Sequence, residues 1–248
     1  MSQRNSPRDV GIGQSQGNTR PLNSDYQPQG EKFPTLQAAI DSVGRPTHQW
    51  SYESPYQYNP TWVLRYDKPD GSKSFQVITE FKGVYYLDLP RIPFPLYCVK
   101  RLYFSSTVYI CEGELSAEAG QSIGLDTTTS LGGPFKAALT DWSPLAGTDV
   151  IVLRDFDEAG LQYAEEVAQL CLTAGACSAK IVTLPDLNEG EGLIEWIGGR
   201  VRPEHQCLQR AQIQAMRMAA NCLARFSGSS INWAADRFSP VRFVKTLV

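Results

Sequence analysis

Three carboxylates follow directly after two apolar stretches of this chain. Glu112 comes after residues 107–111, and Asp155 and Asp157 come after residues 150–153, both stretches being rich in β-branched side chains. Such runs are typical of buried strands in a parallel sheet, whose carboxyl ends meet at the edge where open α/β folds bind their ligands. Three carboxylates at that edge predict a site for magnesium, which prefers oxygen ligands.

Asp155 and Asp157 are the candidate metal ligands, because residues two apart on an extended segment point to the same side. Gly113, next to Glu112, permits a tight turn and a close approach of the backbone to a phosphate. Each carboxylate also has a simpler interpretation as a solvated acid at a strand end, and Asp157 could cap the helix that follows it. The residues alone leave both interpretations open.

Four short sequence blocks occur in a fixed order along the chain. They are EGE at 112–114, TTTSLGG at 127–133, DFDEAG at 155–160 and LIEWI at 193–197. This series resembles the Toprim domain shared by bacterial-type primases, type IA and type II topoisomerases, overcoming-lysogenization-defect-type nucleases and recombination-mediator proteins. It is most similar to the primase-like Toprim domains of phages and plasmids. The resemblance implies a Rossmann-like parallel sheet with helices on both faces.

The resemblance also implies a chemistry. It assigns Mg²⁺, or Mn²⁺ in its place, to Asp155 and Asp157, and it makes Glu112 a general acid or base, or a helper in holding the metal. The leading hypothesis is a primase-like nucleotidyltransferase that joins ribonucleotides on single-stranded DNA in replication of a phage or mobile element. A replicative helicase is a candidate partner. The alternatives are a Toprim nuclease and a degenerate module that binds nucleic acid or a partner without turnover.

The late block departs from the family pattern. Primase-like members carry an aspartate before Leu-x-x-Trp, where this chain has Gly192. If that aspartate supports a second metal, this chain either binds metal weakly or uses a neighbouring glutamate. Three are close in sequence: Glu189, Glu191 and Glu195.

Alternating strands and helices must position these blocks. Apolar residues three or four apart predict a helix over 158–174, and shorter helices are expected at 115–123 and 135–139. Strands are expected at 107–111, 126–130, 150–153 and 178–184. Repeats of this kind bury a parallel sheet between two helical layers and give an α/β fold.

A small β-rich lobe is expected before the α/β part. Strands at 62–66 and 74–79 flank a Pro-Asp-Gly turn, which predicts a hairpin. A third strand is expected at 84–87 and a short helix at 35–43. The lobe resembles the one that precedes Toprim in primase-like proteins, although its second strand lacks the arginines and lysines that the family places there.

The patterns divide the chain into four parts. A polar segment poor in apolar anchors should be flexible, because it cannot offset the entropy of ordering. The tail is expected to be helical, with a helix at 205–224. The expected parts are a flexible segment at 1–31, the β-rich primase-like lobe at 32–104, the Toprim catalytic domain at 105–200 and the tail at 201–248.

Contact with nucleic acid is expected to be local. A net charge of -3 and a pI near 5.5 argue against a protein that coats nucleic acid electrostatically. Lys82 and Arg101, which flank the β-rich lobe and its junction with the α/β part, are the candidate nucleic-acid-binding residues. Four aromatic residues of the lobe could stack on single-stranded bases, or fill its core instead. They are Tyr66, Phe75, Tyr85 and Tyr86.

The cysteines and the hydropathy exclude other classes. The six cysteines form none of the close Cys-x-x-Cys or Cys/His pairs that structural zinc requires, so no zinc is expected. They fit small buried residues in a reducing compartment. No stretch approaches the ~18 consecutive apolar residues of a membrane helix. A cytoplasmic protein without a membrane partner is therefore expected.

Overall fold

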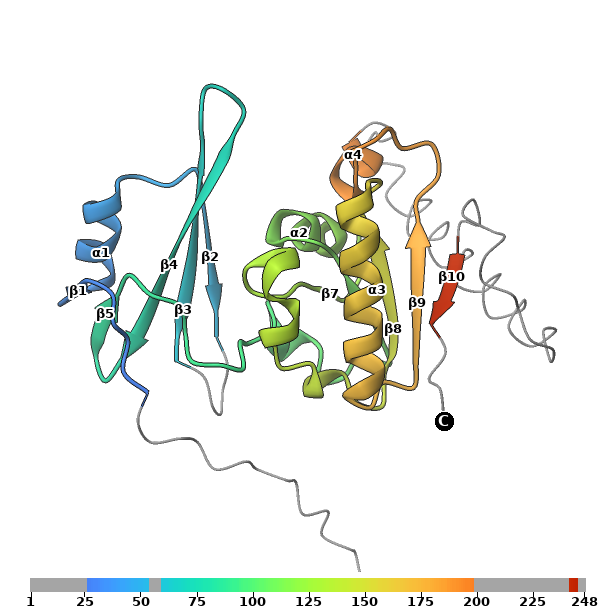
Figure 1. Ribbon diagram of the computed structural model, residues 1–248, viewed down its shortest axis with the longest axis horizontal. Coiled ribbons are helices and arrows are strands. Elements are labelled where there is room, and N and C mark those ends of the chain that lie inside the picture. Colours follow the sequence, from blue (N-terminus) through green and yellow to red (C-terminus); the bar gives the residue numbers. More distant parts are fainter. Residues whose placement is uncertain (1–25, 54–58, 199–240, 245–248) are drawn as a thin grey trace, which may run out of the picture.

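The computed structural model describes residues 26–53, 59–198 and 241–244. These form two units, a β-rich lobe at 31–88 and an α/β domain that begins near residue 94 (Figure 1). The expected helix at 205–224 lies outside the described residues, as does most of the expected flexible segment at 1–31. No described helix combines the length and apolar character needed to cross a membrane.

The β-rich lobe is an antiparallel sheet in the order β1-β5-β4-β3-β2. The predicted hairpin is present as β3 (Thr61–Asp67) and β4 (Lys73–Phe81), and the predicted third strand as β5 (Val84–Tyr86). The predicted helix is α1 (Leu36–Val43), capped by the hydroxyl of Thr35. The lobe also contains two strands that were not predicted, β1 (Lys32–Phe33) and β2 (His48–Tyr52).

The two faces of the lobe's sheet have different partners. Leu64 and Ile78 pack with Ala39 of α1 on one face. On the other face, Trp50 and Val63 belong to a core that continues into the α/β domain. Because successive strand residues alternate between faces, even-numbered residues of β3 face α1 and odd-numbered residues face the α/β domain.

The α/β domain contains the predicted parallel sheet. Within the described residues its strand order is β10-β9-β8-β6-β7, and every pair except β10 with β9 is parallel. The parallel strands are β6 (Thr107–Ile110), β7 (Thr127–Thr128), β8 (Asp149–Arg154) and β9 (Ser178–Thr183). The edge strand β10 (Val241–Val244) comes from the tail, beyond the segment 205–224 for which a helix was expected.

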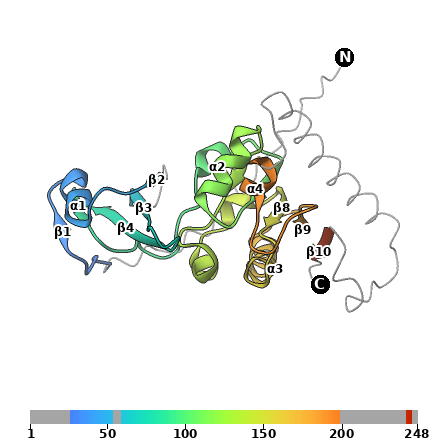
Figure 2. The ribbon, with the colours of Figure 1, turned by 90° about the horizontal axis from the view of Figure 1, so that it is seen from above.

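Helices cover both faces of this sheet, as predicted. Val150 and Val152 of β8 pack in the core under α3 (Glu158–Thr173). Ile151 and Leu153 pack on the opposite face with α2 (Glu114–Ser122) and α4 (Leu193–Gly198). The view from above shows α3 on one side of β8 and β9, with α2 and α4 on the other (Figure 2). The fold class is therefore α/β, with a β-rich lobe before it.

The segment expected as a helix at 135–139 is a 3₁₀ helix instead, η2 (Gly133–Leu139). It begins at Gly133 after the capping residue Gly132, both glycines being at positive φ, with Pro134 in its first turn. Two shorter 3₁₀ turns are η1 (Val99–Arg101) and η3 (Ser143–Leu145). Short segments with little room to repeat the α-helical pattern commonly adopt this tighter geometry.

Candidate acidic active site

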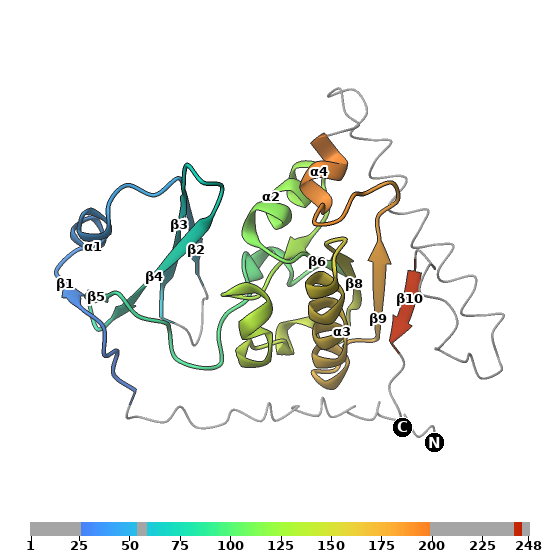
Figure 3. The ribbon, with the colours of Figure 1, turned by 45° about the horizontal axis from the view of Figure 1, so that its top comes forward.

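The three predicted carboxylates lie at the same carboxyl edge of the sheet. Ile110 of β6 lies opposite Val152 of β8, so Glu112 and Asp155 leave neighbouring strands at nearly the same level. Figure 3 shows β8 and β9 ending on the side of the molecule where α4 lies. The charges of Asp155 and Asp157 both act on Glu112. We call Glu112, Asp155 and Asp157 the acidic site.

Glu112 is poorly solvated for an acid. Its Oε2 atom is buried and has no hydrogen-bond partner among the described residues. Burial raises the pKa of Glu112 to about 7, the charges of Asp155 and Asp157 add to the rise, and Lys73 opposes it. A carboxylate with a pKa near neutrality can both accept and donate a proton at physiological pH. Glu112 therefore has the properties that a general acid or base requires.

The pKa of Asp155 is raised as well, for a similar reason. Burial raises the pKa of Asp155 to about 6. The charges of Asp157 and Glu195 contribute to this rise, while the charge of Lys73 opposes it. The carboxylate lies against Gly192, where a Cβ would stand 2.8 Å from Cγ of Asp155. Position 192 is thus part of the wall that holds Asp155.

Asp157 has the capping role that the sequence left open. Its Oδ1 accepts a 2.6 Å hydrogen bond from the amide of Gly160 at the start of α3. Arg154 donates a 3.1 Å hydrogen bond to the backbone carbonyl of Asp157 and thereby fixes the same turn. A cap uses one of the two carboxylate oxygens, so capping and metal binding are compatible. The cap also sets the direction of the carboxylate.

The acidic site fits a magnesium ion held jointly with a substrate. After burial, the charges of Asp155 and Asp157 raise the pKa of Glu112, and the charge of Asp157 raises the pKa of Asp155, so negative charge is concentrated around the buried Oε2 of Glu112. No three His, Cys, Asp or Glu side chains of the described residues converge closely enough to hold a metal alone. Mg²⁺ usually keeps several waters and binds one or two carboxylates plus substrate phosphates. Asp155 and Asp157 suit that kind of site.

The second sequence block lies beside Glu112. Its loop turns at Gly132 and Gly133, where φ is 83° and 60°. A Cβ on Gly133 would lie 3.6 Å from the backbone oxygen of Glu112. Lys136 packs its side chain over Gly132. The space around Gly113 is open, so a ligand can approach the backbone there.

The late block supplies one further acid. Glu195 acts on Asp155, and its Oε2 accepts a 2.9 Å hydrogen bond from the amide of Gly192. Glu191 has another role, because its carboxylate accepts hydrogen bonds from the backbone and side chain of Asn188. Of the nearby glutamates, Glu195 is thus the one that the structure brings to the acidic site.

Glu114 lies in the first turn of α2. Its side chain is buried and accepts a 2.8 Å hydrogen bond from Tyr52 of the β-rich lobe. Burial raises the pKa of Glu114, while the Tyr52 hydrogen bond and the charge of Arg65 lower it. The second glutamate of the EGE block therefore links the two units.

The two predicted nucleic-acid-binding residues lie away from the acidic site. Lys82 is in the β4–β5 turn, 5.0 Å from the ring centre of Phe81. Lys73, whose charge does act on the acidic site, is at the other end of β4, roughly 26 Å from Phe81 at strand spacing. Arg101 is in η1 and contacts Gln121 at the far end of α2. The structure gathers neither Lys82 nor Arg101 with the carboxylates.

Comparison with known proteins gave matches among solved structures alone. A scan of protein-family models and a search of curated proteins found no match. Similar structures include the primase fragment of the bacteriophage T7 primase-helicase protein, at 19% identity over 57% of this chain and 59% of that chain, with a TM-score of 0.38. The zinc-binding and RNA polymerase domains of Aquifex aeolicus primase match at 18% identity, 62% and 36% coverage, and a TM-score of 0.44.

A DNA primase domain from Pseudomonas aeruginosa matches at 13% identity, with 66% of this chain and 55% of that chain covered and a TM-score of 0.38. This chain thus spans between 36% and 59% of the length of the three structures. A functional assignment therefore depends on the residues of the acidic site.

Proposed function

We propose that this chain is a primase-like Toprim protein that performs magnesium-dependent nucleotidyl transfer in DNA replication of a phage or mobile element. One observation carries the proposal: four sequence blocks spread over residues 112–197 surround one site. EGE supplies Glu112, DFDEAG supplies Asp155 and Asp157, the TTTSLGG loop lies beside Glu112, and the late block forms the wall behind Asp155. Blocks that occur in a family's order and also meet in space support the family's chemistry.

The residues of the acidic site would have different roles in the proposed reaction. Asp155 and Asp157 would hold Mg²⁺, which when bound offsets the negative charge of the reacting phosphates. Glu112 would accept the proton of the attacking hydroxyl at Oε2, since its pKa of about 7 lets it exchange a proton near neutrality. The open space at Gly113 leaves room for the phosphate. The substrates would be ribonucleotides and single-stranded DNA, in the cytoplasm, with a replicative helicase as a partner.

Primer synthesis by the purified chain tests this proposal. With single-stranded DNA, labelled ribonucleotides and Mg²⁺, wild type should make short products, and Asp155→Ala should make none. Glu189→Gln is the matched control, because it removes a charge from an exposed acid near α4. No product on any template, even with a helicase added, would overturn the assignment. Cleavage of labelled DNA without nucleotides would favour the nuclease instead.

A non-catalytic binding module is the second candidate. Two observations favour it: Asp157 already serves as the cap of α3, and Gly192 stands where the family pattern has an aspartate. Calorimetric titration of Mg²⁺ or Mn²⁺ into wild type and Asp157→Ala separates the candidates. Equal heats in the two proteins would support the binding module, whereas a loss of affinity in the variant would support a metal-dependent site.

A further inference from the structure

Phe75 differs from the other aromatic residues of the β-rich lobe. Half of its surface is exposed. No other large apolar side chain among the described residues of the lobe is exposed to this degree. Tyr66 and Tyr85 pack instead against the core beneath α1. Of the four aromatic residues considered for base stacking, Phe75 is therefore the most exposed.

The strand register shows which way Phe75 faces. Val63 of β3 lies opposite Val77 of β4, and this pair packs toward the α/β domain. Arg65 and Phe75 form the next pair on the same face of the sheet, one step closer to the hairpin turn. Phe75 therefore extends the domain-facing surface beyond the part that is packed.

The same face of the sheet contacts the EGE block of the α/β domain. Tyr52 of β2 packs with Val63 on this face, and its phenol donates a 2.8 Å hydrogen bond to Glu114, two residues after Glu112. Lys73 lies on this face as well, two residues before Phe75. Figures 1 and 3 agree that the β3–β4 turn is on the side of the molecule where β9 ends. Phe75 is therefore located between Arg65 and Lys73 on a surface that faces the acidic site.

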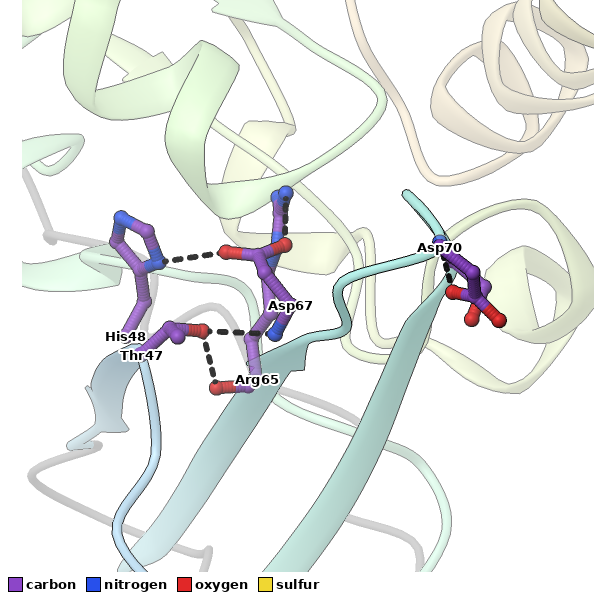
Figure 4. A network of polar contacts seen from close by, with 6 residues as sticks. Thr47, His48, Arg65, Asp67 and Asp70 are labelled. Carbon is purple, nitrogen blue, oxygen red and sulfur yellow. Dashed lines mark hydrogen bonds and ion pairs between the residues drawn. The ribbon is translucent and has the colours of Figure 1, made fainter.

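Polar contacts hold the end of the hairpin in place. The carboxylate of Asp67 lies between Arg65, at 2.7 Å, and His48, at 3.6 Å (Figure 4). The hydroxyl of Thr47 accepts a 3.0 Å hydrogen bond from the amide of Asp67 and donates a 2.8 Å bond to the carbonyl of Arg65. Arg65 is therefore partly neutralised, and Lys73 forms no ion pair with any described residue.

We propose, resting on the function proposed above, that Phe75 is a stacking platform for a nucleobase and that Lys73 contacts the phosphate attached to it. An aromatic ring accepts any base, because every base has a π-face, and an adjacent cation binds the backbone or the nucleotide phosphate. The negative phosphate would lie between Lys73 and a metal at the acidic site. The base comes from an incoming nucleotide or from single-stranded DNA, two sources that share this chemistry.

Equilibrium binding with base-containing and base-free probes tests the platform. ATP and an oligodeoxythymidylate carry bases, whereas tripolyphosphate and an abasic oligonucleotide of equal length do not. Phe75→Ala should weaken binding of at least one base-containing probe by roughly five- to a hundredfold and leave the base-free probes unchanged. Phe75→Trp should retain the affinity. Lys73→Ala should weaken base-containing and base-free probes alike.

The control is Phe104→Ala, which removes another exposed phenylalanine, one that precedes β6. An effect on ATP alone would place the incoming nucleotide on Phe75, and an effect on the oligonucleotide alone would place the template there. Equal affinities of wild type and Phe75→Ala for both base-containing probes would overturn the platform, as would an equal loss for the base-free probes. So would a wild type that binds neither ATP nor the oligonucleotide.

The primer assay distinguishes this result from failure of the proposed function. Base-dependent binding through Phe75 without any primer synthesis would retain the platform and reject the nucleotidyltransferase. The opposite result is primer synthesis that is lost in Asp155→Ala but retained in Phe75→Ala. If Phe75→Ala also bound the base-containing probes as tightly as wild type, the platform alone would be rejected.

Discussion

Gly192 and the carboxylate of Asp155 occupy adjoining space, so that a Cβ at position 192 would stand 2.8 Å from Cγ of Asp155. The amide of Gly192 is also bound by Glu195, an acid whose charge raises the pKa of Asp155. The absence of a side chain at 192 thus allows Asp155 its present position, and Glu195 is the acid of the late block whose charge acts on Asp155.

Gly192→Ala should destabilise the protein because the added methyl overlaps Asp155. We expect a loss of about 1–3 kcal/mol in the free energy of unfolding, the usual cost of overpacking a closed site. Urea denaturation measures it. Gly198→Ala is the control, since a Cβ there would meet nothing within 4 Å. Equal stabilities of the two variants would show that Asp155 has room to move.

The stability of the metal-free protein should fall as pH rises from about 4 to about 7. Glu112 and Asp155 have folded-state pKa values of about 7 and about 6, raised from 4.5 and 3.8. The folded state therefore keeps protons that the unfolded state has released. This stabilisation is complete below about pH 4 and is lost as pH passes through the folded-state values.

Urea midpoints measured in EDTA across that range check the pH dependence. Glu112→Gln should flatten the slope, because it removes one titrating group, whereas Glu189→Gln should not. A midpoint that rises over the interval, or equal slopes in the two variants, would contradict the assignment. Added Mg²⁺ should stabilise the protein most at high pH, because metal ligands must be deprotonated.

Tyr52→Phe should weaken the link between the β-rich lobe and the α/β domain. The change removes the 2.8 Å hydrogen bond to Glu114 and leaves that acid buried without the phenol donor. A loss of about 1–3 kcal/mol is expected, the desolvation cost of an unsatisfied buried group. The control is Tyr97→Phe, whose phenol bonds the exposed Glu118 at 3.1 Å. Similar losses in both variants would argue against a special role for the buried pair.

Substitutions of Asp157 should separate its capping role from its charge. Asparagine is as good a helix cap as aspartate, so Asp157→Asn should keep the stability of α3 while lowering affinity for Mg²⁺. Asp157→Ala should lower both, with about 1 kcal/mol of stability lost with the cap. Thermal unfolding and calorimetric titration give the two quantities. Undiminished Mg²⁺ affinity in Asp157→Asn would leave Asp157 as a cap alone.

Local patterns in the sequence were sufficient to predict most of the α/β fold. The β-branched runs before Glu112 and Asp155 are buried strands, and the helical periodicity after Asp157 is α3. Parallel strands bring their carboxyl ends to one edge, so the order of elements also predicted that these acids would be close. The metal and the roles of Lys82 and Arg101 remain predictions.

Tertiary structure alone decided what faces the acidic site. The hydrogen bond between Tyr52 and Glu114 joins residues 62 positions apart, and the influence of Lys73 on Glu112 also crosses between the two units. Such contacts depend on how two separately formed sheets pack, which no local periodicity encodes. For the same reason the sequence could identify Phe75 as an aromatic strand residue but could not show that its ring stays exposed on the side that faces the carboxylates.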